Sequence, residues 1–441
     1  MEKQEEKKSW GTGGLFGHRT ISSLALILAC PYFVMILWYG NCHCNGSLIQ
    51  LVDAVKVNGA LFAISKVSLT NVLAWKIILS FMVFELALMR LVPGKEFRAT
   101  TTATGHVPIY NANGVECYFI SIATLFGLSY FKLFSPSLVY DNMGDMLISM
   151  CVFALVICIC LMFKGLYFPS TADSGSTGDT ISDFFWGTEL YPRVLGFDIK
   201  QFTNCRFGMM YWQLGILCYA FKQYEVHGCI SSAMLVSVVV QTVYIFKFFL
   251  WETGYLCSMD IQHDRAGYYI CWGCLVWVPS VYTLHTFYLV DHPIYLSAGV
   301  AVLYIIAGVA CVWCNYDCDR QRQEFRKSNG TMRIWGGPAY FITASYTTAD
   351  GVKRSSLLLT CGWWGVSRHF HYIPEILASV FWCIPNSMAI GGIIPFFYPI
   401  YLTLLLLDRA WRDDARCAEK YGEDWKRYCK EVPYKIIPGV I

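Results

Sequence analysis

Four side chains near the end of the chain recur at every fourth residue and combine charge, a thiol and a phenol. They are Arg409, Asp413, Cys417 and Tyr421. An α-helix turns once in about 3.6 residues, so these side chains would share one slowly drifting face. Because arginine forks match phosphate oxygens, such a face has the chemistry of a phosphate-recognition surface. The alternative is a membrane helix that leaves the bilayer with arginines reaching back to the interface.

Two further groups of residues add aromatic rings and cations. Residues 359–372 hold tryptophans, glycines and a dense cluster of arginine and histidine. Arg322 and Arg326 stand one helical turn apart on one face of a predicted helix. Together with the C-terminal helix, these arginines could hold a phosphate-bearing dinucleotide. No Gly-x-Gly-x-x-Gly with a following acidic residue occurs in the chain, which excludes a Rossmann site.

Composition indicates which elements must position these groups. The 441-residue chain is 56% hydrophobic and 15% charged, whereas soluble domains carry about 25% charged residues. Its apolar runs approach the roughly 20 residues that a membrane-spanning helix needs. We therefore predict an all-α polytopic membrane protein with about ten transmembrane helices and cytosolic loops that form a cofactor pocket. The predicted spans cover residues 22–39, 72–92, 117–134, 146–168, 209–221, 231–250, 267–290 and 296–314, with two more within 376–407, bent at Pro385 or at residues 391–392.

Basic residues orient the predicted spans. Lys and Arg gather at both ends of the chain and in the loops after spans two, four and eight, while the opposite loops are charge-poor. The positive-inside rule then places both termini in the cytosol. We expect residues 1–20 to form a short cytosolic N-terminal arm and residues 21–441 to form one transmembrane domain. The cofactor-binding part would cover approximately residues 315–441.

The loop of residues 169–208, which includes Lys200 and Arg206, holds more rings and paired charges than ordinary linkers do. The alternative for this loop is a structured segment with ion pairs at its surface. Glu252 and Asp260 precede span seven, and ionisable groups at membrane depth are functional candidates. The alternative for these acids is that they lie solvated at the membrane edge.

Cysteine usage gives no sign of a metal site. Most of the 20 cysteines lie in apolar runs, where a free cysteine is a small hydrophobic side chain. The Cys271-x-x-Cys274 motif has no histidine pair near it in the sequence. We therefore expect no bound metal.

Several motifs, in order, resemble the membrane sterol reductase family, which includes the sterol 14-reductases and the lamin B receptor. The resemblance runs from about residue 22 to residue 441 and is highly specific. The motifs are Gly187-Thr-Glu-Leu-Tyr-Pro-Arg193, Phe197-Asp-Ile-Lys200, Met259-Asp-Ile-Gln-His-Asp-Arg265, Gly362-Trp-Trp-Gly365 and Arg416-Cys-Ala-Glu-Lys-Tyr-Gly422.

The resemblance implies a ten-helix reductase of the endoplasmic reticulum that uses NADPH in sterol biosynthesis. Sterol 14-reductases typically place asparagine before a tyrosine where this chain has His371 before Tyr372, which argues against that branch. The branch that reduces the carbon 7–8 double bond of 5,7-diene sterols is favoured instead. By motif matching, cofactor contacts would fall on Arg322, Arg326, Leu359, Trp364, His371, Tyr372, Arg409, Asp413, Cys417 and Tyr421.

The chemistry of such a reduction calls for an acid. An unactivated alkene accepts hydride only after a proton has been added to one of its carbons. A buried tyrosine or a carboxylic acid with a raised pKa can donate that proton. The candidates are Tyr244, placed first, and Glu252, Asp260, Tyr268 and Tyr269. The sterol would lie among spans five to ten in an apolar pocket open to lipid; no nucleic-acid partner is expected, and protein partners stay open.

Other functions are compatible with part of the pattern. A sterol 14-reductase shares the family motifs. An isoprenylcysteine-type membrane methyltransferase shares an Arg-His-x-x-Tyr run and a C-terminal Tyr-Gly motif, but the motifs at residues 189–206 and 260–265 favour the reductase. A transporter would show repeat symmetry, which the sequence lacks. A scaffold of the lamin B receptor type would need a large basic N-terminal domain.

Overall fold

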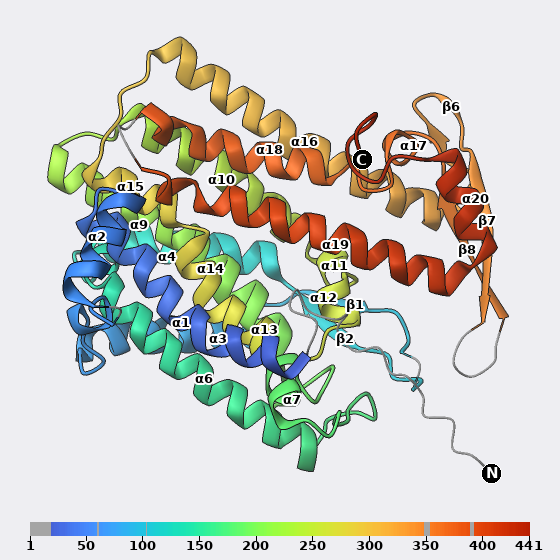
Figure 1. Cartoon of the computed structure of the whole chain (residues 1–441), viewed down its shortest axis with the longest axis horizontal. Helices are drawn as coiled ribbons and strands as arrows, with labels where there is room; N and C mark the ends of the chain where they lie inside the picture. Colours follow the sequence, from blue (N-terminus) through green and yellow to red (C-terminus); the bar gives the residue numbers. More distant parts are fainter. Residues whose placement is uncertain (1–18, 60, 103, 348–352, 389–391) are drawn as a thin grey trace. The chain divides into compact units, whose positions relative to one another are not determined.

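Helices make up most of the structure, a computed structural model that describes residues 19–59, 61–102, 104–347, 353–388 and 392–441 (Figure 1). The predicted helical, polytopic organisation is confirmed, but the count of about ten spans is not. Six helices of the described residues are long and apolar enough to cross a membrane. They are Thr20–His43, Val72–Leu91, Met143–Tyr167, Ser232–Leu250, Tyr268–Asp291 and Ala298–Lys327.

Two other predicted spans form helices that do not meet this standard. Span 117–134 lies on α4, Gly114–Tyr130, which ends after 17 residues. Span 209–221 lies on α9, Met209–His227, whose apolar surface is interrupted by polar residues such as Gln213. These helices are too short or too polar to be assigned as spans by length and composition.

The described residues form two compact units. The first takes in those of Met1–Ile230, Phe248–Pro293 and Ala389–Pro395. The second takes in those of Ser231–Lys247, Ile294–Met388 and Phe396–Ile441. The part expected to bind the cofactor, approximately residues 315–441, therefore falls almost entirely in the second unit.

The first unit is a helical bundle with short hairpins. Two of its helical segments, η2 and η3, are π-helices, a widened form that is frequent at functional sites. The expected arm, residues 1–20, lies outside the described residues except for its last two. The elements are α1 (Arg19–His43), α2 (Leu48–Asn58), η1 (Ile64–Lys66), α3 (Val72–Leu91), β1 (Lys95–Arg98), β2 (Ile109–Ala112), α4, α5 (Ser137–Asp141), α6 (Met143–Tyr167), α7 (Thr180–Trp186), β3 (Arg193–Val194), β4 (Phe197–Asp198), α8 (Ile199–Gln201), η2 (Phe202–Gly208), α9, α11 (Glu252–Tyr255), α12 (Met259–Gln262), α13 (Tyr268–Trp272), η3 (Gly273–Trp277), α14 (Val278–Val281), α15 (Leu284–Asp291) and η5 (Ile394–Phe396), which ends in the second unit.

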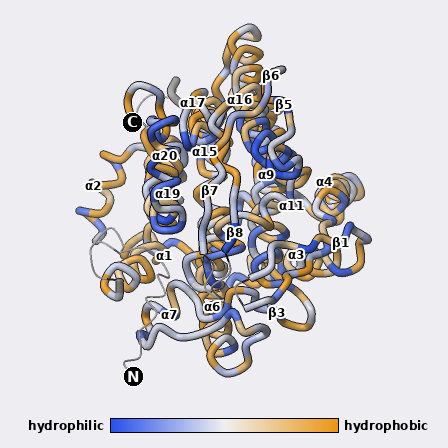
Figure 2. Tube along the Cα trace, turned by 90° about the vertical axis from the view of Figure 1, so that its right-hand side faces the viewer, coloured by the Kyte–Doolittle hydropathy of each residue, from blue (hydrophilic) through white to orange (hydrophobic). Residues whose placement is uncertain are grey.

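The second unit is built on three long helices that lie side by side, α16, α18 and α19 (Figure 1). Helix α10 begins in this unit and ends in the first. In Figure 2 hydrophilic residues mark α20 and the adjoining part of α19. The elements are α10 (Ser232–Leu250), α16 (Ala298–Lys327), β5 (Arg333–Ile334), β6 (Gly337–Pro338), β7 (Phe341–Thr347), β8 (Lys353–Leu359), α17 (Trp363–Val366), α18 (Tyr372–Cys383), η4 (Ile384–Met388), α19 (Phe397–Tyr421) and α20 (Glu423–Glu431).

The predicted bend within residues 376–407 is present near its proline. Helix α18 ends at Cys383, and Pro385 lies in the short 3₁₀ segment that follows. Proline lacks a backbone N–H and clashes with the preceding turn, which ends a regular α-helix. The alternative bend was predicted at residues 391–392, and residue 391 lies outside the described residues. Helix α19 then runs without interruption from an apolar start to a charged end.

An antiparallel hairpin that the sequence analysis did not predict lies next to α20. Strands β7 and β8 pair from Phe341 with Leu359 to Thr347 with Lys353. Alternate residues of β7 are buried, as expected for a sheet with one covered face. The buried face packs in one cluster with α20 and the segment after it: Ile342, Ala344, Leu358, Trp425, Tyr428 and Val432. The cluster fixes the end of α19 against the hairpin.

Candidate functional site

The predicted four-residue face lies on one helix, α19. Asp413 Oδ2 lies 3.8 Å from His369 Nε2, which joins this face to the segment before α18. Further along, Cys417 and Tyr421 pack against the cluster formed by the β7–β8 hairpin and α20. Arg409 is half-buried, and its charge acts on Glu375 of α18. This side of α19 therefore packs against, or acts electrostatically on, other parts of the second unit along its length.

Rings and a guanidinium meet around Trp364. The indole Nε1 of Trp364 donates to the carbonyl of Cys318 over 2.8 Å. Arg322 lies over the same ring, with its Cζ 4.3 Å from the ring centroid. The His371 ring lies 5.0 Å from Trp364 and 4.3 Å from Tyr372, centroid to centroid. The structure thus brings together four of the predicted cofactor residues.

The glycine before Trp363 has a steric reason. Gly362 has φ +64°, a left-handed conformation that side chains rarely adopt. A Cβ at this position would also collide with the Gln321 side chain, which accepts a hydrogen bond from Trp363 N over 3.0 Å. The tight turn explains the Gly-Trp-Trp motif and places Trp364 against α16.

Arg326 and Leu359 occupy contrasting places beside this group. Leu359 is buried in one cluster with Phe325, Ile334 and Trp364. Arg326 is exposed, one helical turn after Arg322 on α16. Within the part of the chain that the structure describes, Arg326 makes no hydrogen bond or ion pair. Its guanidinium is available to a ligand.

Arg368, by contrast, has a structural task. Its side chain is 8% exposed and donates to the carbonyls of Val432 and Pro433 over 2.7 and 3.0 Å. The backbone N–H groups of Arg368 and His369 donate to Tyr434 and Lys435. The C-terminal segment is therefore fastened to the residues that lead into His371.

Both histidines of this segment are neutral at physiological pH. Burial lowers the pKa of His369 to about 4. Burial, and then the charge of Arg322, lower the pKa of His371 well below its usual range. The Nδ1 atom of His371 is buried without a hydrogen-bond partner among the described residues. A neutral imidazole with an unsatisfied nitrogen is suited to a polar ligand group.

Tyr244, the first candidate proton donor, lies in the second unit with these residues. Its hydroxyl donates to Glu375 Oε1 over 2.5 Å. Glu375 lies in the first turn of α18 and was not among the predicted site residues. Its position, three residues after a predicted cofactor tyrosine and inside an otherwise apolar helix, was the signal that could have revealed it.

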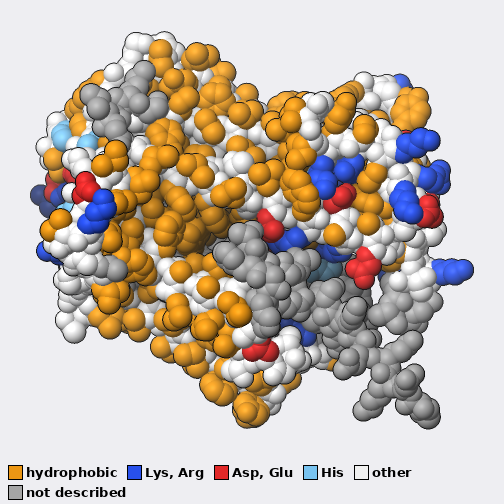
Figure 3. Space-filling view, in the orientation of Figure 1, with side chains coloured by type: hydrophobic (Ala, Val, Ile, Leu, Met, Phe, Trp, Pro, Cys, Tyr) orange, Lys and Arg blue, Asp and Glu red, His pale blue; other side chains and the backbone are white. Residues whose placement is uncertain are grey.

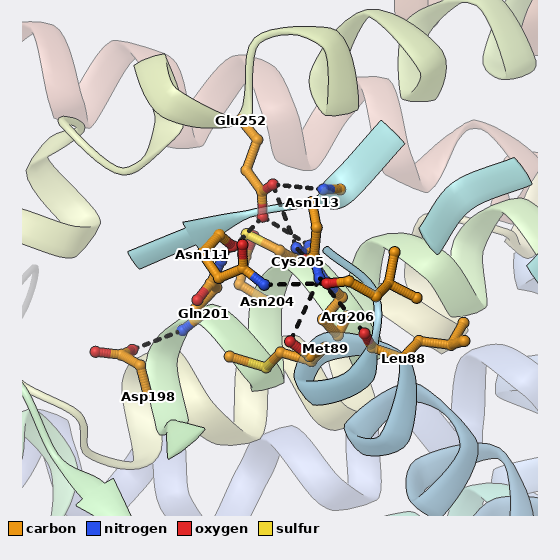
Figure 4. A network of polar contacts seen from close by, with 12 residues as sticks. Leu88, Met89, Asn111, Asn113, Asp198, Gln201, Asn204, Cys205, Arg206 and Glu252 are labelled. Carbon is orange, nitrogen blue, oxygen red and sulfur yellow. Dashed lines mark hydrogen bonds and ion pairs between the residues drawn. The ribbon is translucent and has the colours of Figure 1, made fainter. Parts of the chain in front are cut away.

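Glu252 lies instead in a closed network in the first unit (Figure 4). Its two carboxylate oxygens accept from both terminal nitrogens of Arg206, at 2.6 and 3.2 Å. Gly114 N and the Gln201 amide donate to the same carboxylate. Arg206 also donates to Asn113 over 2.7 Å and is completely buried. The carboxylate thus accepts hydrogen bonds from four donors.

Lys200 repeats this pattern, so the alternative of ion pairs at the loop surface does not hold for Lys200 or Arg206. Lys200 is completely buried, and its ammonium donates to the carbonyls of Asp260, Ile261 and Asp264. Burial lowers the pKa of Lys200 to about 8. A buried ammonium group needs such hydrogen-bond partners, because without them the cost of desolvation would favour its neutral form.

The remaining candidate donors also lie in the first unit. Asp260 is held through its backbone by Lys200 and has a half-exposed side chain. Tyr268 is 2% exposed and stacks on Trp272 at 5.1 Å, with Tyr269 beside Trp186 at 5.3 Å. Tyr244 is therefore the one predicted donor that shares a unit with the predicted cofactor residues.

The first unit also contains an apolar cavity of about 260 Å³. Its walls come from α3, α4, η2 and α9 and include Phe81, Leu125, Phe207 and Tyr211. These elements correspond mainly to predicted spans two, three and five. The sterol pocket expected among spans five to ten stays a prediction.

Comparison with known proteins decides the family. The ergosterol biosynthesis ERG4/ERG24 family matches residues 15–441. The chain belongs to this family. Membership decides against the methyltransferase alternative.

Relatives within the ERG4/ERG24 family carry two names. The chain is 50% identical to the 7-dehydrocholesterol reductase of Arabidopsis thaliana over 420 residues, 95% of this chain and 97% of the relative. It is 33% identical to the 7-dehydrocholesterol reductase of Xenopus laevis over 98% of this chain and 94% of that one. It is 35% identical to the Delta(14)-sterol reductase of Methylotuvimicrobium alcaliphilum, over 95% and 94%. The resemblance to membrane sterol reductases is thus confirmed.

Proposed function

We propose that this protein reduces the carbon 7–8 double bond of 5,7-diene sterols with NADPH, as a step of sterol biosynthesis. The observation that carries the proposal is the 50% identity to a 7-dehydrocholesterol reductase over nearly the full length of both chains. The histidine before Tyr372, in place of the asparagine typical of sterol 14-reductases, supports the same branch. The protein would work in the endoplasmic reticulum membrane with both termini in the cytosol, in keeping with its long apolar helices and basic loops.

The residues of the second unit fit a phosphorylated dinucleotide. Arg322 and Arg326 offer two guanidinium groups one turn apart, and the second has no partner among the described residues. Arginine forks are suited to the 2′-phosphate that distinguishes NADPH from NADH. The unsatisfied Nδ1 of His371 offers a hydrogen-bond contact to an amide. Arg322 and Arg326 would hold the phosphate, and Trp364, His371 and Tyr372 would contact the rings; Leu359, Arg409, Asp413, Cys417 and Tyr421 complete the proposed site.

Reduction needs a proton and a hydride at neighbouring carbons. Protonation of carbon 8 of a 5,7-diene leaves an allylic cation over carbons 5 to 7. NADPH, when bound, supplies the hydride that carbon 7 accepts. Tyr244 is the residue of this chain that we expect to hold the transferable proton, because it shares a unit with the proposed cofactor site.

A sterol 14-reductase is the second candidate function. The 35% identity to a Delta(14)-sterol reductase over 95% of the chain favours it. Both reactions need the same proton and hydride donors, so the site chemistry does not separate them. The choice depends on the sterol that the protein accepts.

Sterol reduction by microsomes that contain this chain tests the proposal. With NADPH, a 5,7-diene should lose its ultraviolet absorption, deuterium from labelled NADPH should appear at carbon 7, and solvent deuterium should appear at carbon 8. Microsomes without the chain provide the control. Reduction of an 8,14-diene with the 5,7-diene left untouched would assign the protein to the other branch.

A further inference from the structure

The contact between Tyr244 and Glu375 introduces an acid that the family motifs do not assign. We propose that Glu375 supplies the proton that Tyr244 passes to the sterol alkene, so that the two side chains act as one relay. This inference rests on the proposed sterol reduction. The inference adds Glu375 to the proposed reaction as a second residue that carries the proton.

The two side chains of the pair are close together and partly buried. Tyr244 comes from α10 and Glu375 from the first turn of α18, and their oxygens lie 2.5 Å apart. The Trp382 ring, from the next turns of α18, lies 5.4 Å from the Tyr244 ring and is completely buried. A hydrogen bond this short between a phenol and a carboxyl group lets a proton pass between the two oxygens without movement of the backbone.

A chain of contacts joins the pair to the proposed cofactor residues. Lys247, one turn after Tyr244, has its ammonium 5.7 Å from the Tyr244 ring centroid. It donates to the Asn315 side-chain oxygen over 2.5 Å, and the Asn315 amide donates to the backbone carbonyl of His371 over 3.0 Å. The Tyr244–Glu375 pair and His371 are thus linked through Lys247 and Asn315.

The surroundings of Glu375 suit a carboxyl group that holds its proton. Burial raises the pKa of Glu375 above its ordinary value, against the opposing effects of Lys247 and of the Tyr244 hydrogen bond. Asp319 of α16 raises the pKa further, and Arg409 of α19 lowers it. Helix α18 is not among the six apolar spans, and Glu375 precedes its apolar part.

A relay is chemically stronger than a phenol alone. A free phenol has a pKa of about 10 and a carboxylic acid one of about 4, so the carboxylic acid is the better source of a proton for an alkene. In the proposed step the phenol hydrogen turns from Glu375 toward the alkene, and the protonated carboxyl group of Glu375 donates to the Tyr244 oxygen instead. The π electrons of the alkene then form the bond from carbon 8 to the Tyr244 proton, the phenol O–H bond breaks, and the Tyr244 oxygen takes the proton of Glu375. The carboxylate that remains lies near Lys247 and regains a proton from solvent before the next turnover.

Glu375→Gln is the decisive variant, because an amide keeps the shape of the side chain and has no acidic proton. In single-turnover reduction by the full-length protein in microsomes, its rate should fall by ~10²–10⁴-fold, the range expected for loss of a general acid. NADPH binding, measured by fluorescence titration, should be unchanged. Glu423→Gln, an exposed glutamate of α20 paired with Lys426, is the matched control and should keep the wild-type rate.

Two further variants separate a relay from a packing role. Glu375→Asp retains an acid and should recover part of the lost rate. Tyr244→Phe combined with Glu375→Gln should be no slower than the slower single variant, because residues that act as a unit are not additive. The wild-type rate should fall at high pH as Glu375 deprotonates, and Glu375→Gln should lack this dependence.

Infrared spectroscopy gives a readout that does not depend on the substrate. The carbonyl stretch of a protonated carboxylic acid should be present in the wild type, absent in Glu375→Gln and shifted in Tyr244→Phe. A Glu375→Gln variant that reduces the diene at the wild-type rate, or a wild type without this band, would overturn the relay. The rate is measured with both the 5,7-diene and the 8,14-diene, so an error in the proposed substrate would not hide the result.

Discussion

Two arginine sites of this protein use the same side chain in opposite ways. In the first unit, Arg206 is completely buried, and Glu252 and Asn113 occupy its terminal nitrogens. In the second unit, Arg322 lies on an indole ring, and Arg326 is exposed with no hydrogen bond or ion pair to any described residue. An arginine whose terminal nitrogens bind a buried carboxylate holds the fold together. An exposed arginine without an ion-pair partner among the described residues is suited to an anion from outside the chain.

Cations at the surface of the second unit also differ in whether they have an ion-pair partner. On the face shown in Figure 3, Lys and Arg side chains gather at the right-hand end, where Figure 1 places α20 and the β7–β8 hairpin. Helix α20 carries cations with partners three residues away, such as Lys426 with Glu423 and Arg427 with Asp424. Exposed pairs of this kind contribute little to stability. Positive charge alone therefore does not identify an anion-binding site. A cation without an ion-pair partner is the better indication of one.

The largest effect is expected from the closed site. Arg206→Ala would leave the Glu252 carboxylate buried without its cation, which costs about 3–5 kcal/mol. The melting temperature of the protein purified in detergent should fall by many degrees, or the folded protein should not be recovered. Arg98→Ala, which removes an exposed partner of Glu96, is the control and should cost under about 1 kcal/mol. Equal stability of the two variants would contradict the structural role of Arg206.

A smaller effect, on binding and not on folding, is expected from the open site. Arg326→Ala should raise the KM for NADPH by ~10–100-fold, the worth of a charge-assisted hydrogen bond, and should leave the KM for the sterol nearly unchanged. The variant should also discriminate less between NADPH and NADH.

Lys327→Ala is the control for this substitution, because Lys327 is the exposed cation next to Arg326 on α16. It should leave the NADPH KM unchanged. A wild type that uses NADH and NADPH equally well would show that the paired arginines do not read the 2′-phosphate.

The smallest effect is expected from pH. The pKa of His369 is about 4 when folded and 6.5 ordinarily, so the folded state binds fewer protons than the unfolded state between these values. The stabilisation is therefore complete above about pH 6.5 and is lost as the pH falls toward 4, by on the order of 1–3 kcal/mol. Melting temperatures measured from pH 7 to pH 4.5 should show a steeper fall for the wild type than for His369→Gln. Parallel curves would mean that His369 does not become protonated on unfolding.

Periodicity predicted the α19 face because one helix carries all four residues, and local spacing is enough to align them. Contacts between residues far apart in the sequence could not be predicted from local spacing. Tyr244 and Glu375 are 131 residues apart, and Arg206 and Glu252 are 46 apart, so only the folded structure shows that the members of each pair are in contact. The β7–β8 hairpin was missed because its alternation of buried and exposed residues is short. The span count is not confirmed where helices such as α4 are shorter than the apolar run that contains them.

The hydrogen bonds of residues 432–441 make the histidine segment depend on residues far from it in the sequence. Ser367 donates to the carbonyl of Ile436, and the backbone of Arg368 and His369 pairs with Tyr434 and Lys435. The terminal carbonyl of Ile441 accepts from Lys435 and Ile436 and closes the segment on itself. Removal of residues 432–441 would keep every proposed cofactor residue, yet it would remove the backbone and side-chain partners of residues 367–369. The histidine segment would then lose its position although its own sequence is unchanged.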